Sequence, residues 1–151
     1  MTGKARILLV DDDTNIRQTL AIVLQEEGYA VDTAENGKEA IEKSFANFYN
    51  LAVVDWRLPD IEGTLLLSQL KETTPKMVKI MLTGYPSMNN AIEAVNLHAD
   101  AFLVKPVDVE ELLKKIRELL ILQEENKEFC ETKIVSYIET RTKQILEADS
   151  P

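Results

Sequence analysis

Short apolar runs alternate along the chain with segments whose apolar residues recur at the spacing of an α-helix. The apolar runs occupy 6–10, 29–34, 51–54, 77–82 and 101–104. Their length and their content of valine, leucine and isoleucine are typical of strands buried on both faces of a sheet. The segments with helical spacing lie at 14–27, 36–47, 65–72, 84–98 and from 108 onward. This alternation predicts an α/β fold, a doubly wound five-stranded parallel sheet with helices on both faces.

The apolar positions of two predicted helices indicate which side faces the sheet. In the helix over 36–47 we expect Ile41, Phe45 and the adjacent Phe48 to point inward. In the helix that begins near 108 the equivalent stripe consists of Leu112, Leu113, Ile116, Leu119 and Leu120.

The last 29 residues, 123–151, differ in pattern from the rest of the chain. They open with the polar run 123–128 and resume apolar spacing at Ile134, Tyr137 and Ile138. We predict a domain over 1–122 and a helical C-terminal extension over 123–151, with a hinge at the polar run as an option. Two roles stay open for the extension: a solvated helix, or a helix that pairs with a second copy or another partner.

Composition and charge exclude several classes of function. The chain has 17 Lys and Arg against 26 Asp and Glu, a net charge of −9, so we expect no direct nucleic-acid binding. No apolar run reaches the roughly 18 residues of a bilayer span, and the first residues lack a signal-peptide pattern, so we expect a cytoplasmic protein without membrane contact. Because Cys130 and His98 are single, any metal must be a hard cation bound by oxygen.

Polar residues stand at the ends of four predicted strands. They are Asp11 and Asp12, Asp55, Thr83 and Lys105. The carboxyl ends of parallel strands share one edge of a sheet, and ligands bind there. Three carboxylates about 5 Å apart repel by roughly 3 kcal/mol per pair at an effective dielectric constant near 20, and a divalent cation is the simplest relief. Mg²⁺ fits because it takes oxygen ligands and shares its coordination sphere with phosphate.

Lys105 and Thr83 add groups that bind a phosphoryl group. The ammonium of Lys105 is a point-charge partner for a phosphoryl oxygen, and the Thr83 hydroxyl can donate to one. A carboxylate can itself attack phosphorus when nearby cations neutralise the incoming oxygens. Asp55 is the best candidate nucleophile, because it ends the strand at the centre of the sheet.

Four sequence strings carry these residues: ILLVDDD at 7–13, VVDWRLPD at 53–60, MLTG at 81–84 and FLVKP at 102–106. In order and spacing they resemble the receiver domain of two-component response regulators, and the resemblance runs from residue 5 to about 121. It implies a CheY-like, flavodoxin-like fold with strand order 2-1-3-4-5.

The resemblance also implies how the site works. Asp55 would accept a phosphoryl group from a sensor histidine kinase or a phosphotransfer protein. Asp12, Asp55 and the main-chain carbonyl of Arg57 would hold Mg²⁺, and Asp11 would act on it mainly through water.

A conformational switch is implied as well. Thr83 and Lys105 would contact the phosphoryl group, Phe102 takes the aromatic switch position, and the Lys105–Pro106 peptide would be cis. We expect phosphorylation to draw Thr83 and the loop 84–90 inward, to repack the face that includes Phe102 and Tyr85, and so to change affinity for a downstream protein.

Two other classes of protein compete with this interpretation. A phosphatase of the haloacid-dehalogenase type also uses an aspartate nucleophile, but its motif would need Thr or Val where Asn15 stands. A receiver-shaped adaptor that is never phosphorylated is the other alternative, and the intact set of site residues argues against it. We therefore expect a switch and not an enzyme. Homodimers through the C-terminal helix or the switch face, and a part in a longer regulator, stay open.

Overall fold

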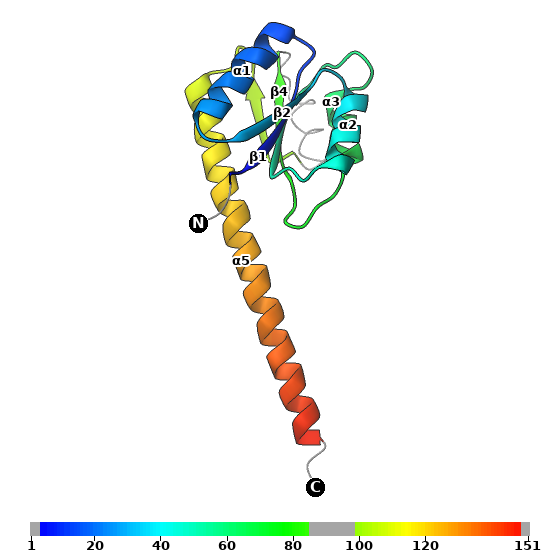
Figure 1. The fold of residues 1–151 in the computed structure, drawn as a ribbon, viewed down its shortest axis with the longest axis vertical. Helices are drawn as coiled ribbons and strands as arrows, with labels where there is room; N and C mark the ends of the chain where they lie inside the picture. The colour runs from blue at the N-terminus through cyan, green and yellow to red at the C-terminus, as the bar shows by residue number, and fades with distance from the viewer. Residues whose placement is uncertain (1–3, 85–98, 149–151) are drawn as a thin grey trace.

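Five parallel strands form one sheet in the order β2-β1-β3-β4-β5. Figure 1 shows the sheet with helices packed around it. A computed structural model of the chain describes residues 4–84 and 99–148. The strands are β1 (Arg6–Val10), β2 (Ala30–Ala34), β3 (Leu51–Asp55), β4 (Val78–Thr83) and β5 (Ala101–Val104). The described helices are α1 (Thr14–Glu26), α2 (Gly37–Ala46), α3 (Gly63–Gln69) and α5 (Val109–Ala148). The predicted fold class and strand order are confirmed, and the helix expected over 84–98 lies outside the described residues.

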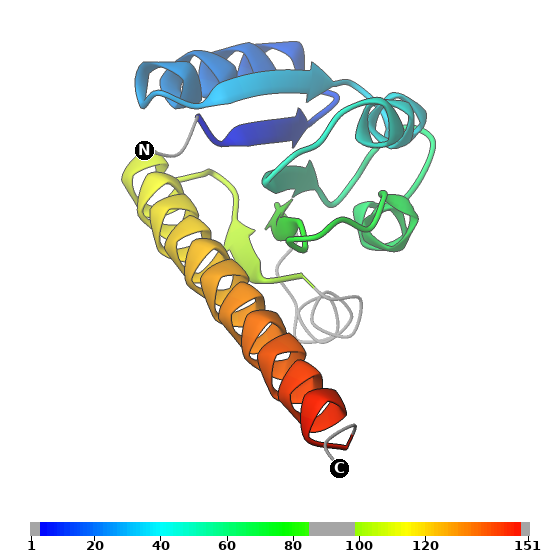
Figure 2. The same ribbon diagram turned by 60° about the horizontal axis from the view of Figure 1, so that its bottom comes forward.

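The strands are buried on both faces because alternate residues enter two separate cores. Ile7, Leu9 and Val53 face α1 and α5, whereas Leu8 and Val54 face α2 and α3. Figure 2 shows this layering, with α1 and α5 on one side of the sheet and α2 and α3 on the other. In the strand order β3 is central and β1 is its neighbour, so these two strands end side by side near the middle of the sheet's carboxyl edge.

Helix α2 packs through small side chains, so one sequence expectation is wrong. Phe45 is 60% exposed and Phe48 is 40% exposed, whereas Ala40 and Ser44 are buried. The buried positions follow the helical repeat at 37, 40 and 44, which turns Phe45 outward. Ile41 packs partly against the core, as expected.

Helix α5 is one unbroken helix that extends well beyond the sheet (Figure 1). Leu112, Leu113 and Ile116 are buried, and Leu119 and Leu120 pack partly against the core, as the sequence predicts. The option of a hinge at 123–128 is wrong, because the helix continues through this run.

Two features of the polar run account for this continuity. Gln, Glu and Lys are strong helix formers. The Gln123 amide donates to the main-chain carbonyls of Asn50 at 2.9 Å and Lys76 at 2.8 Å, which ties the helix to the sheet domain. Over residues 4–84 and 99–148, no helix combines the length and apolar character of a membrane span.

Candidate functional site

Strand register brings the predicted site residues to one edge of the sheet. Val10 pairs with Val54, so Asp11 and Asp55 follow at the same level on neighbouring strands. Asp55 pairs in turn with Leu82, and Thr83 pairs with Val104. The main-chain N–H of Lys105 donates to the Thr83 carbonyl at 2.6 Å, which places Lys105 directly beyond β5 and beside β4.

Three carboxyl groups form the centre of the site. One oxygen each from Asp11, Asp12 and Asp55 lies within 4.8 Å of the other two. Asp11 and Asp55 are buried, at 1% and 7% exposure, whereas Asp12 is exposed. At 4.8 Å and an effective dielectric constant near 20, each pair of charges repels by about 3.5 kcal/mol. The donor set is oxygen only, which fits a hard divalent cation such as Mg²⁺.

Lys105 supplies the positive charge at this centre in the structure. Its Nζ lies 3.1 Å from Asp11 Oδ2 and 3.1 Å from Asp55 Oδ1. Burial works against the ammonium, but the hydrogen bond to Asp55 and the charges of both carboxylates outweigh it and raise the pKa of Lys105. Lys105 therefore stays charged across the physiological range.

The surroundings of Asp55 hinder the ionisation of its carboxyl group. Burial, with the charges of Asp11 and Asp12, raises its pKa, while the hydrogen bond from Lys105 opposes the shift. A cation that binds near a buried carboxylate lowers the free energy of its ionised form, because the positive charge offsets the cost of burial and of the neighbouring negative charges. A cation bound beside Asp55 would therefore favour its ionised form.

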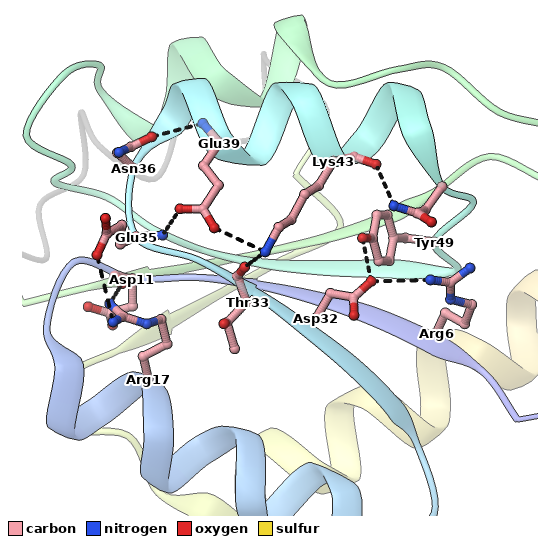
Figure 3. Close-up of polar contacts among 11 residues, drawn as sticks. Arg6, Asp11, Arg17, Asp32, Thr33, Glu35, Asn36, Glu39, Lys43 and Tyr49 are labelled. Carbon is pink, nitrogen blue, oxygen red and sulfur yellow. Dashed lines mark hydrogen bonds and ion pairs between the residues drawn. The ribbon is translucent and has the colours of Figure 1, made fainter.

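Asp11 is held in place by four contacts of its own. Its Oδ1 accepts the N–H of Asp13 at 2.9 Å, and its Oδ2 accepts from Lys105. Its main-chain N–H donates to Ala34 at 3.1 Å, and its carbonyl accepts from Arg17 Nη1 at 2.8 Å (Figure 3). Because both carboxylate oxygens already have partners, Asp11 is oriented before any ligand arrives.

Sequence reasoning missed Arg17. The residue lies on α1, one turn beyond the acidic run, and its guanidinium also approaches Glu35 at 4.0 Å. The only signal in the sequence was a basic residue six positions after Asp11, on a helix that starts at the sheet edge. A basic residue at such a position can make many different surface contacts, so the signal did not point to Asp11. Asp13 caps α1, since its Oδ1 accepts the N–H of Ile16 at 3.0 Å.

The loop after Asp55 is closed at its base. The N–H of Gly63 donates to the Trp56 carbonyl at 2.7 Å, and Arg57 and Glu62 form an isolated antiparallel bridge. A Cβ on Gly63 would lie 2.3 Å from the Asp55 carbonyl oxygen, so only glycine fits at the start of α3. The loop that carries Arg57 is therefore a tight hairpin.

The ring of Phe102 in β5 contacts the ring of Trp56, the residue that follows β3. Their ring centroids are 6.4 Å apart and the planes are at 80°, an edge-to-face contact. The position of Phe102 is thus coupled by packing to the residue next to Asp55. The Lys105–Pro106 peptide is cis. Tyr85 and the loop 85–90, which the sequence placed in the switch, lie outside the described residues.

The fold and site define a doubly wound α/β protein with an acidic cluster and a lysine at the carboxyl edge of its sheet. The family model of the response regulator receiver domain matches residues 7–117, and the chain belongs to this family. It is therefore a receiver domain of the two-component signalling systems.

Known relatives agree with this assignment. The chain is 35% identical over 117 residues to the response regulator ArlR of Staphylococcus saprophyticus, covering 76% of this chain and 52% of that protein. It is 34% identical over 119 residues to the transcriptional regulatory protein ResD of Bacillus subtilis, covering 79% and 49%. The chain thus spans about half the length of the curated relatives it matches.

Solved structures agree in fold. A CheY-like receiver domain protein from Methanospirillum hungatei superposes with a TM-score of 0.78 at 44% identity, covering 82% of this chain and 99% of that one. A response regulator from Burkholderia pseudomallei, solved with a phosphorylated aspartic acid and a calcium ion, gives a TM-score of 0.68 at 35% identity, covering 73% and 65%.

Proposed function

We propose that the chain accepts a phosphoryl group on Asp55 from a histidine kinase or phosphotransfer protein, in a reaction that requires Mg²⁺. The observation that carries this proposal is the position of Asp55, which is buried, 3.1 Å from the Lys105 ammonium and within 4.8 Å of two further carboxylates. The phosphorylated aspartic acid and calcium ion of the Burkholderia pseudomallei relative support it.

The chemistry assigns a task to each side chain. A carboxylate oxygen of Asp55 attacks phosphorus, the new P–O bond forms as the P–N bond of a phosphohistidine breaks, and the imidazole departs with the electron pair of that bond. The Lys105 ammonium can stay paired with the negative charge of the phosphoryl group once it is on Asp55, because its Nζ already contacts Asp55. Thr83 ends the neighbouring strand and is assigned to a phosphoryl oxygen.

The metal would be held by Asp12, Asp55 and the Arg57 main-chain carbonyl, with Asp11 acting mainly through water. When bound, Mg²⁺ neutralises charge on the phosphoryl oxygens. Both oxygens of Asp11 have partners in the structure, which supports its indirect role.

Phosphorylation then changes affinity for a downstream protein through Thr83 and Phe102. Because Phe102 contacts Trp56, movement at the acceptor has a direct packing route to β5. The expectation of no direct nucleic-acid binding rests on the net charge of this chain and stays a prediction, since one relative, of which the matched residues cover 49%, is named a transcriptional regulatory protein. The cytoplasmic location also stays a prediction.

Intact-mass measurement after incubation with acetyl phosphate tests the proposal. The wild type should gain one phosphoryl group with Mg²⁺ and none with EDTA, and Asp55→Asn should gain none under either condition. An unmodified wild type would favour the non-phosphorylated adaptor, and a modified Asp55→Asn would place the acceptor elsewhere.

A further inference from the structure

Asp60 joins the loop of the proposed metal site to the start of helix α2. Its Oδ1 accepts the N–H of Gly37 at 2.8 Å and its Oδ2 accepts the N–H of Lys38 at 2.9 Å. Each carboxylate oxygen thus binds one of the first two amides of the helix, which have no partner within a helix. The amide of Gly37 is the main cause of the lowered pKa of Asp60, which stays ionised at neutral pH.

An apolar contact reinforces the joint between loop and helix. Ile61, the next residue, packs against the core formed with α2 and α3. A Cβ on Gly37 would lie 2.1 Å from Ile61 Cγ2, so the loop is seated directly on the backbone of the helix. Polar and apolar contacts therefore fix the same stretch of loop to the same turn of α2.

The joint lies within the hairpin that presents Arg57. The hairpin is tied at its base by the Arg57–Glu62 bridge and by the bond from Gly63 to Trp56. Asp60 is the residue that ties its far end to a different element. A loop fixed at both ends has few alternative positions for its carbonyl groups, and a metal site gains affinity from ligands that are held in place before binding.

We propose that Asp60 is a positioning residue, whose double bond to the N-terminus of α2 holds the Arg57 carbonyl in place and so sets the affinity of the acidic cluster for Mg²⁺. The inference rests on the proposed metal site. It assigns no contact between Asp60 and the ion, and its effect is transmitted by the loop.

Asn36 offers a matched control on the same helix. Its Oδ1 accepts the N–H of Glu39 at 2.8 Å, so this side chain caps α2 through a bond within the first turn of the helix (Figure 3). Asn36→Ala should therefore weaken α2 without releasing the joint. Asp60→Asn removes the charge of Asp60 but keeps one amide oxygen as an acceptor, which separates charge from hydrogen bonding.

Amide NMR titration with MgCl₂ tests the proposal on the full chain. Asp60→Ala should raise the dissociation constant for Mg²⁺ about tenfold, the low end of the effects seen for residues that orient metal ligands. Asp60→Asn should fall between Asp60→Ala and the wild type, and Asn36→Ala should bind as the wild type does.

The wild type provides a second readout that needs no variant. By thermodynamic linkage, a joint that strengthens Mg²⁺ binding is itself strengthened by Mg²⁺ to the same degree. Saturating Mg²⁺ should therefore slow hydrogen exchange at the amides of Gly37 and Lys38, by up to about tenfold. The amide of Glu39, which is bound to Asn36, should slow less.

The outcomes are distinct. A wild type that does not bind Mg²⁺ would overturn the proposed function and this inference together. A wild type that binds Mg²⁺ no better than Asp60→Ala, or an Asn36→Ala variant that loses as much affinity as Asp60→Ala, would overturn the inference alone. Equal losses in Asp60→Asn and Asp60→Ala would assign the effect to the charge of Asp60 and so overturn its positioning role. Unchanged hydrogen exchange at Gly37 and Lys38 on Mg²⁺ binding would overturn that role as well.

Discussion

Replacement of Lys105 by methionine tests the charge balance of the site. The ammonium contacts Asp11 and Asp55 at 3.1 Å, and the two carboxyl groups are almost completely buried. Methionine keeps most of the side-chain volume and removes the charge. The perturbation therefore leaves two buried carboxylates without their cation, next to the exposed Asp12.

The structure sets the expected size of the effect. Carboxylate oxygens within 4.8 Å of one another repel by about 3.5 kcal/mol per pair at an effective dielectric constant near 20. Removing one member of a buried ion pair costs about 3–5 kcal/mol. Because the Lys105 side chain is 20% exposed, we expect the lower end, about 3 kcal/mol of unfolding free energy for Lys105→Met without Mg²⁺.

Two conditions should shrink this loss. Mg²⁺ restores positive charge among the carboxylates, so it should stabilise Lys105→Met more than the wild type. Acid should act in the same direction. The pKa of Asp55 is already raised in the folded state, and loss of the opposing Lys105 bond raises it further. As the pH falls through that pKa, the folded state takes up the proton, the repulsion disappears and the deficit decreases.

Urea unfolding at pH 8 and pH 5, with and without MgCl₂, measures all of these effects. Lys115→Met is the matched control, because the Lys115 ammonium pairs with Glu118 at 3.6 Å on the surface of α5. It should cost at most about 0.5 kcal/mol and respond to neither condition. A Lys105→Met deficit that is the same at both pH values and unaffected by Mg²⁺ would refute the reasoning.

Three further substitutions test interactions elsewhere in the fold by urea unfolding. Lys79 is buried in β4, and its Nζ donates to the Leu67 carbonyl at 2.7 Å. Burial lowers the pKa of Lys79 in the folded state. As the pH rises toward the normal lysine range, the unfolded state therefore binds more protons than the folded state does. The stability of the wild type relative to Lys79→Met should therefore increase from pH 7 to pH 10, and a constant difference would contradict this. Tyr49→Phe should cost about 1 kcal/mol, because the Tyr49 hydroxyl donates to Asp32 at 2.6 Å; no loss would mean that water replaces this bond fully. Asn36→Ala should cost about 1 kcal/mol through loss of the α2 cap, and an unchanged midpoint would deny the cap a role.

Strand ends were the most predictable part of the molecule. The apolar run before Asp11 and the run that Asp55 ends both predict buried strands of a parallel sheet. The position of the site then followed from the rule that ligands bind at the carboxyl ends of such strands. The contact of Lys105 with both carboxyl groups agrees with that expectation, since all three residues lie at one edge. The roles assigned to them remain proposals.

Contacts between distant segments were the least predictable part. Asp60 binds Gly37 and Lys38, which lie 23 and 22 residues earlier, and no local pattern marks such a pair. The outward position of Phe45 had the same origin, because the side of α2 that faces the sheet depends on the space left by its neighbours. The continuity of α5 through 123–128 depends partly on carbonyl groups of Asn50 and Lys76 that receive Gln123.

The central claim is that the side chain of residue 55 carries the phosphoryl group. Borohydride reduction after incubation with acetyl phosphate and Mg²⁺, followed by peptide mass spectrometry, locates an acyl phosphate directly, because reduction converts the modified aspartate to homoserine. We predict homoserine at position 55 alone, and none when EDTA replaces Mg²⁺. Homoserine at Asp11, Asp12 or Asp60 with Asp55 intact would contradict the account.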